Sequence, residues 1–133
     1  MNVKSQDPTD IVIGLLERSF CAVQVAACVV DAYGIFAWGI NNVGPSGYGE
    51  HAEAHCLKRA NRKRLSEATL YVAAKRRRNN KTVTARPCAA CAGLIIQAGI
   101  ARVISVEPEP DLAKRWADSL DATTELFAEA GVM

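Results

Sequence analysis

Residues 68–73 (ATLYVA) give the clearest β-strand signal in this chain of 133 residues. The segment is apolar, contains β-branched and aromatic side chains, and is not interrupted by glycine or proline. A helix is predicted before it, at residues 51–64, and another after it, at residues 88–98, where Gly99 ends the helical pattern. A strand between two helices predicts an α/β fold.

The elements on either side extend this pattern. Towards the N-terminus, Asp7 can cap a helix and Pro8 suits the first helical position, so a helix is predicted over residues 8–18. The other predicted elements are an antiparallel strand pair at 21–30 and 35–39, a loop at 41–49, a short basic hairpin at 75–86, a strand at 100–106 and a last helix from Asp111. This order implies one domain, residues 1–133, in which helices flank a sheet.

The composition excludes several classes of protein. Half of the residues are apolar and 23% are charged, which is typical of a folded globular chain. Residues 1–10 lack the pattern of a signal peptide, and the most apolar stretch, residues 20–30, is too short to span a membrane. We therefore expect a soluble, cytoplasmic protein with no membrane partner. Five cysteines without a secretory signal predict reduced thiols, some of them metal-bound.

Three side chains of the metal-binding type occur in two clusters. Cys88 and Cys91 form a Cys-x-x-Cys motif at a predicted helix start, where the helix dipole favours the thiolate form, and His51 comes from another helix. Three protein ligands leave the fourth tetrahedral position of zinc open for water, which is typical of a catalytic site with one Zn²⁺ per chain. Zinc lowers the pKa of such a water from about 16 towards about 7.

Glu53 follows His51 by two residues in the first turn of the same predicted helix. Its carboxyl group can lie beside the bound water without joining the metal ligands. Hydrolytic removal of an amine needs a proton taken from water, one delivered to a ring nitrogen and one delivered to ammonia. A single carboxyl group can make each transfer in turn, so Glu53 is predicted as the catalytic acid and base.

These motifs resemble those of the zinc-dependent cytidine and deoxycytidylate deaminase superfamily, with signature H-x-E and P-C-x-x-C. The matching residues are His51-Ala52-Glu53 and Pro87-Cys88-Ala89-Ala90-Cys91, together with Gly39-Ile40-Asn41, Thr69-Leu70-Tyr71-Val72 and residues 99–103. Residues 115–132 look most like the end of deoxycytidylate (dCMP) deaminases. One departure is length, since 14 positions separate Val72 from Pro87 where the family usually has a few.

The resemblance implies a cytidine deaminase-like fold, which is a three-layer α/β/α sandwich around a central mixed sheet of four to five strands. It also implies zinc held by His51, Cys88 and Cys91, Glu53 as acid and base, and a homo-oligomer. Asn41 is expected to contact substrate because it fits G-x-N, although Asn42 is a rival in the same loop. Ala52, Arg86 and Pro87, which lie within two positions of a ligand in the sequence, are predicted as further substrate contacts.

Other candidate residues have ordinary structural interpretations. His51 and His55 have the i, i+4 spacing of a metal-binding pair, but the Glu is misplaced for the H-E-x-x-H motif, which favours a packed or surface His55. Trp38 could stack on a base, and core packing explains it equally well. The remaining cysteines, Cys21, Cys28 and Cys56, are interpreted as small core residues.

The formal charge of +2 hides an uneven distribution. Residues 58–86 contain 11 of the 16 basic residues and one acid, Glu67, for a net charge of +10, and the rest of the chain carries −8. This basic segment lies between His51 and the cysteines in the sequence, so it favours a phosphate-bearing substrate over a neutral nucleoside.

Three functions remain open from the sequence. The first is hydrolytic deamination of a cytosine nucleotide, dCMP to dUMP and ammonia. The second is deamination of cytosine or adenine in single-stranded DNA or RNA bound along residues 75–86, although that hairpin contains no aromatic residue for stacking. The third is a zinc-stabilised binding module without activity, against which Glu53 argues.

Overall fold

The computed structural model describes residues 7–43, 49–106, 127 and 129–132. Its helices are α1 (Pro8–Leu15), the short 3-10 helix η1 (Leu16–Arg18), α2 (Ala52–Arg59), α3 (Arg62–Leu65) and α4 (Ala89–Ala98). Its strands are β1 (Val23–Asp31), β2 (Gly34–Ile40), β3 (Asn42–Val43), β4 (Gly49–Glu50), β5 (Thr69–Arg76) and β6 (Arg102–Ser105). No helix of the described ranges has the length and apolar character needed to cross a membrane.

The described residues contain a four-stranded mixed sheet in the order β2-β1-β5-β6. β1 pairs antiparallel with β2 and β5, and β5 pairs parallel with β6. The predicted strand at 68–73 is thus β5 in the interior of the sheet, and the predicted strand pair is the β1–β2 hairpin. β3 and β4 form a separate small antiparallel pair at the two ends of the segment predicted as a loop, and β4 extends one residue beyond it. The predicted α/β fold class and mixed sheet are confirmed.

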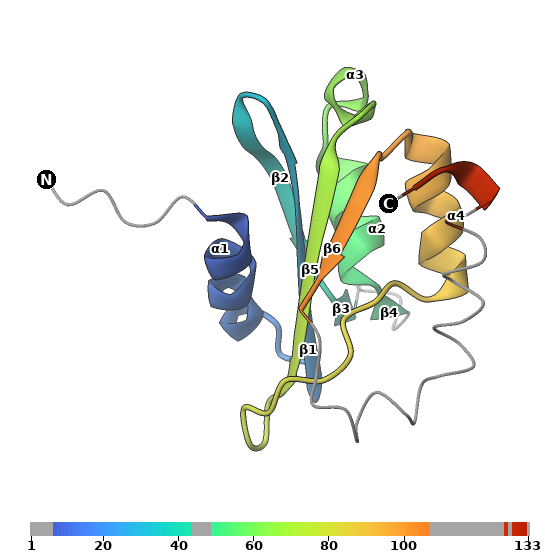
Figure 1. Ribbon diagram of the computed structural model, residues 1–133. Helices are drawn as coiled ribbons and strands as arrows, with labels where there is room; N and C mark the ends of the chain where they lie inside the picture. Colours follow the sequence, from blue (N-terminus) through green and yellow to red (C-terminus); the bar gives the residue numbers. More distant parts are fainter. Residues whose placement is uncertain (1–6, 44–48, 107–126, 128, 133) are drawn as a thin grey trace, which may run out of the picture.

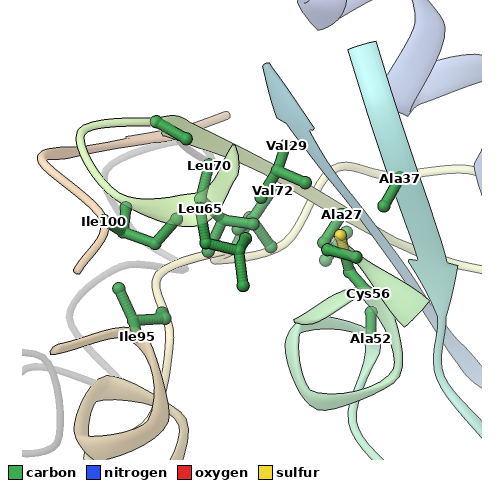
Figure 2. Close-up of a cluster of buried hydrophobic side chains, with 14 of the residues drawn as sticks. Ala27, Val29, Ala37, Ala52, Cys56, Leu65, Leu70, Val72, Ile95 and Ile100 are labelled. Atoms are coloured by element: carbon green, nitrogen blue, oxygen red, sulfur yellow. The ribbon is translucent and has the colours of Figure 1, made fainter. Parts of the chain in front are cut away.

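Helices cover both faces of this sheet (Figure 1). On one face, α1 packs its Val12 against Ala26, Cys28 and Ala73 of the central strands. On the other face, α2 and α4 bury a larger cluster that includes Ala27, Val29, Leu70 and Val72 from the sheet, Ala52 and Cys56 from α2, and Ile95 from α4 (Figure 2). Strand alternation therefore divides each central strand between an α1 face and an α2/α4 face.

Two predicted elements differ from the structure by more than one or two residues at their ends. The predicted helix 51–64 is broken, because Ala60 is extended and the side chain of Asn61 accepts a hydrogen bond from the Lys63 amide at 2.9 Å, which starts α3. The predicted basic hairpin begins as a continuation of β5 and turns back at residues 77–81, where the Arg76 amide donates to the Lys81 carbonyl at 2.9 Å.

The last predicted helix lies largely outside the described residues. Phe127, from its C-terminal part, packs against the cluster on the α2/α4 face.

Candidate active site

The three predicted metal ligands lie together at the starts of two neighbouring helices. His51 is the residue before α2, Cys88 is the residue before α4, and Cys91 is in the first turn of α4. Within the described residues, their ligand atoms lie within 4.8 Å of one another. His51 Nδ1 is 3.2 Å from Cys91 Sγ and 3.6 Å from Cys88 Sγ. A zinc-bound nitrogen and sulfur in tetrahedral geometry are about 3.5 Å apart, so the donor set fits zinc.

Burial makes the Cys91 site unfavourable for a thiolate without a cation. Burial raises the pKa of Cys91, and the neighbouring carboxylate of Glu53 and the thiol of Cys88 raise it further. A divalent cation reverses this effect because it binds the deprotonated sulfur directly. Cys28 and Cys56 are fully buried as well, and burial raises the pKa of each to about 12, but neither belongs to the ligand cluster of the described residues.

Glu53 is buried beside the cluster, with 5% of its surface exposed. Burial raises the pKa of its carboxyl group because it disfavours the charged form, and a hydrogen bond with the residue's own backbone and the charge of His51 oppose that rise. Its place in the first turn of α2, two residues after His51, keeps the carboxyl group close to the ligands. This environment suits a group that both accepts and donates protons.

A cavity of about 350 Å³ opens onto this site. It is lined by Val23, Val25, Asn41, His51, Ala52, Glu53, Arg76, Val83, Thr84, Ala85, Arg86 and Cys88. Of the predicted substrate contacts, Asn41, Ala52 and Arg86 therefore line it, whereas Pro87 is fully buried and is not one of the lining residues. A separate cavity of about 530 Å³ between α2 and α4 contains none of the predicted metal ligands.

The Asn41 side chain, just after β2, forms hydrogen bonds with the backbone of β1. Its Oδ1 accepts hydrogen bonds from Ser19 Oγ at 2.6 Å and from the Val25 amide at 2.9 Å, and its Nδ2 donates to the Val23 carbonyl at 2.7 Å. The rival residue Asn42 instead donates to Glu50 Oε1 at 3.3 Å. Asn41 thus lines the cavity as a fixed group.

Gly39 allows α2 to approach β2 closely. A Cβ atom at this position would lie 2.3 Å from the Cys56 amide nitrogen and 2.6 Å from the Ala52 carbonyl oxygen. His55 supports the same contact, because its Nδ1 lies 3.1 Å from both the amide nitrogen and the carbonyl oxygen of Ile40. His55 is therefore a packing residue at the α2–β2 contact and lies outside the ligand cluster of the described residues.

Trp38 belongs to the opposite face of the sheet. It pairs with Cys28 in the β1–β2 ladder and packs in the α1-face cluster, where the guanidinium groups of Arg59 and Arg18 lie 4.3 and 5.5 Å from its ring centroid. It does not line the 350 Å³ cavity.

Sequence reasoning missed two polar residues of the cavity, Arg76 and Thr84. Arg76 was assigned to a hairpin, but strand alternation from Val72 and Ala74, which face the α2/α4 core, would have placed Arg76 on that same face. Nothing in the sequence distinguishes Thr84 from the neighbouring Thr82.

A family model and a known protein match the sequence of this chain. A family model described as the cytidine and deoxycytidylate deaminase zinc-binding region matches residues 8–107. A protein of Aliivibrio fischeri described as an uncharacterized deaminase in the luxG 3′ region is 40% identical over 50 residues, which are 38% of this chain and 34% of that protein. The match thus spans about a third of that relative's length.

Solved structures share the fold at low sequence identity. RibD of Acinetobacter baumannii has a TM-score of 0.65 at 22% identity over 96% of this chain and 33% of its own. The dCMP deaminase of cyanophage S-TIM5 has a TM-score of 0.63 at 23% identity over 99% and 96% of the two chains. Cytidine deaminase of Burkholderia pseudomallei has a TM-score of 0.56 at 17% identity over 80% and 85%.

Proposed function

Because the chain belongs to the cytidine and deoxycytidylate deaminase zinc-binding family, we propose that it deaminates a cytosine nucleotide, with dCMP as substrate and dUMP and ammonia as products. The observation that carries the proposal is the buried carboxyl group of Glu53 at the wall of a cavity that His51 and Cys88 also line. The cavity volume of about 350 Å³ is in the range of small-molecule sites.

The proposed mechanism assigns each step to a residue of the chain. His51, Cys88 and Cys91 would hold zinc, which when bound supplies activation of water as a nucleophile near neutral pH. Glu53 takes the proton of the attacking water and delivers it to the ring nitrogen N3. The water oxygen bonds to C4, and Glu53 then takes the remaining proton from this new hydroxyl group. Glu53 delivers that proton to the exocyclic nitrogen, which leaves as ammonia as its bond to C4 breaks and the C4 carbonyl forms. The base becomes uracil.

A nucleotide is favoured over a nucleoside by the charge around the cavity. Arg76 and Arg86 line it together with Glu53, and a 5′-phosphate would neutralise part of that positive charge. The cyanophage dCMP deaminase, which has this fold, has been solved with dCMP and dUMP. We extend that substrate to this chain as a proposal.

The test is ammonia release from dCMP, deoxycytidine, CMP and cytidine by the zinc-loaded protein. We expect dCMP to be the preferred substrate, and Glu53→Gln to lower kcat by about 10²- to 10⁴-fold with unchanged zinc content. Glu17→Gln, an exposed residue on the α1 face, is the matched control and should retain full activity. Equal turnover of dCMP and deoxycytidine, or full activity in Glu53→Gln, would contradict the proposal.

One observation favours a second candidate, deamination within single-stranded nucleic acid. An aromatic residue that is distant in the sequence, Phe20, lies beside the basic turn, and it is 83% exposed. The Arg77 guanidinium donates a hydrogen bond to the Phe20 carbonyl at 3.0 Å and lies 5.8 Å from the centroid of its ring. Exposed aromatic rings beside arginines can stack on bases. Salt-dependent binding of a cytosine-containing oligonucleotide, weakened by Phe20→Ala, would support this candidate.

We also expect the active protein to be a homo-oligomer. Sedimentation of the zinc-loaded protein at several concentrations tests this expectation.

A further inference from the structure

The segment 76–86 contributes a distinct part of the cavity wall. Arg76, Val83, Thr84, Ala85 and Arg86 all line the cavity, and they come from the stretch by which this chain exceeds the usual family spacing before Pro87. The turn at 77–81 projects beyond the end of the sheet (Figure 1), and residues on both sides of the turn line the cavity.

The register of β5 fixes the face on which Arg76 lies. Arg76 pairs with Val23, and Ala74 pairs with Val25. Both valines line the cavity, and Ala74 packs in the α2/α4-face core. Arg76 therefore follows Val72 and Ala74 on the α2/α4 face of β5, and it lines the same cavity as His51 and Cys88.

The backbone of Arg76 is held on both sides. Its amide donates to the Lys81 carbonyl at 2.9 Å, and its carbonyl accepts from the Asn80 amide at 2.8 Å. Among the described residues, its guanidinium forms no salt bridge with a carboxylate. The arginine thus presents a positive charge to the cavity from a fixed position on the sheet.

Thr84 supplies a second, independent observation. Its Oγ1 is buried and has no hydrogen-bond partner within the described part of the chain, although the residue lines the same cavity. A buried hydroxyl without a partner is destabilising, and such groups are rare in folded proteins. A ligand oxygen in the cavity would satisfy it.

We infer that Arg76 and Thr84 form a subsite for the phosphate group of the substrate. This inference rests on the proposed function and assigns residues to one part of it. Arg76 provides charge-assisted hydrogen bonds to two phosphate oxygens, and Thr84 Oγ1 donates a hydrogen bond to a third. A free nucleotide and a nucleic acid strand offer the same phosphate chemistry, so the experiment includes both.

The test compares dCMP, deoxycytidine and a short single-stranded oligonucleotide with one cytosine. Arg76→Gln is expected to lower the ratio of kcat/KM for dCMP to that for deoxycytidine by about ten- to a hundredfold. Arg78→Gln removes the same charge from the exposed turn and is expected to leave the ratio unchanged. Calorimetric binding of dUMP and deoxyuridine to both variants gives a readout independent of turnover.

Each outcome separates the two proposals. If the wild-type protein deaminates none of the three substrates, the proposed function fails. If it deaminates dCMP and Arg76→Gln lowers turnover and binding equally for nucleotide and nucleoside, the function stands and the subsite is wrong. A loss confined to the oligonucleotide would assign the subsite to a strand phosphate.

Thr84→Val tests the second residue. Removing a buried hydroxyl that lacks a partner is expected to raise the Tm of the ligand-free protein and, at the same time, to lower affinity for dUMP several-fold. Thr82→Val, on the same returning segment but outside the cavity lining, is the control for both measurements. Unchanged dUMP affinity in Thr84→Val would overturn its assignment to the subsite.

Discussion

Lys75 and Arg76 are neighbours on β5 and serve opposite faces of the sheet. Lys75 pairs with Gln24 in the ladder, and its ammonium group contacts the Glu17 carboxylate and, at 3.1 Å, the Asn80 side chain. Arg76 faces the metal ligands and lines the cavity. Strand alternation therefore divides what the sequence presents as one basic run: one charge is paired in a structural contact, and the next is available to a ligand.

The two faces of the sheet also differ in the side chains that they bury. On the α1 face, Val12, Ala26, Cys28 and Ala73 are buried among apolar neighbours. The α2/α4 face contains the buried Glu53 carboxyl group and the thiols of the ligand cluster. Among the described residues, each face also has one buried polar atom without a hydrogen-bond partner, Thr84 Oγ1 on the α2/α4 face and Gln24 Oε1 on the α1 face. Ionisable groups that are buried together beside a cavity are typical of a binding or catalytic site.

Among substitutions that test this difference between the faces, Gly39→Ala is expected to have the largest effect on stability. The new Cβ would meet backbone atoms of α2, at 2.3 Å from the Cys56 nitrogen, and backbone cannot move aside without displacing the helix that carries Glu53. The free energy of unfolding should fall by about 3 kcal/mol, measured by urea denaturation.

The matched control for that substitution lies in α1. A Cβ at Gly14 meets nothing within 4 Å, so Gly14→Ala should raise stability by about 0.5–1 kcal/mol through the better helix propensity of alanine. Equal effects of the two substitutions would show that α2 does not depend on its close contact with β2.

Removal of the metal is expected to have the next largest effect. If zinc is present at about a hundred times its Kd, binding contributes about 2.7 kcal/mol, and chelation should lower Tm by about 10 °C in a thermal scan. Cys88→Ser should abolish this response to chelator. Cys28→Ala, on the α1 face, should keep it, although its own Tm is lower. A response retained in Cys88→Ser would place the metal elsewhere.

A smaller effect is expected for Lys75→Gln. Glu17, its partner, is 71% exposed at the side chain, so loss of the pair should cost less than about 1 kcal/mol of stability. The preference for dCMP over deoxycytidine should not change, in contrast to Arg76→Gln. If both substitutions altered the preference alike, general electrostatic attraction would explain the basic segment better than a defined subsite.

The smallest effect concerns Asp31, at the end of β1 remote from the cavity. Hydrogen bonds from Arg64 Nε at 2.7 Å and Nη2 at 2.8 Å lower the pKa of Asp31 to about 2. The folded-state pKa lies below the unfolded value of about 3.9, so the contribution to stability is complete above that value and is lost as the pH falls towards 2.

The difference in urea midpoint between the wild-type protein and Asp31→Asn should therefore disappear between pH 5 and pH 2. Activity at neutral pH should be the same in both. A difference that persisted at pH 2 would indicate that the substitution acts through packing.

The sequence was sufficient for the parts of the fold that local patterns determine. The β1–β2 hairpin, β5 and α4 follow from apolar runs and from turn residues such as Gly34 and Gly99, both of which have positive φ. The division of the helix at 51–64 was missed because all of its residues are compatible with a helix, and the break depends on one capping contact of Asn61.

The site was predictable where its chemistry depends on short motifs. His51, Cys88 and Cys91 are recognised by spacing, and the structure brings their ligand atoms together. Arg76 and Thr84 were missed because their roles depend on the register of β5 and on the path of residues 82–86, which are long-range properties. Asn41 was selected by a motif, but its hydrogen bonds to Ser19 and β1 are visible only in three dimensions.

The parallel pairing of β5 with β6 has a consequence for the order of folding. Thr69 pairs with Arg102, and the connection between them carries both cysteines of the ligand cluster. The hairpin of β1 and β2 closes a short loop, whereas this crossover closes a long one and is expected to form later. The cysteines would then reach His51 after the main folding barrier, so bound zinc should slow unfolding and leave the folding rate nearly unchanged.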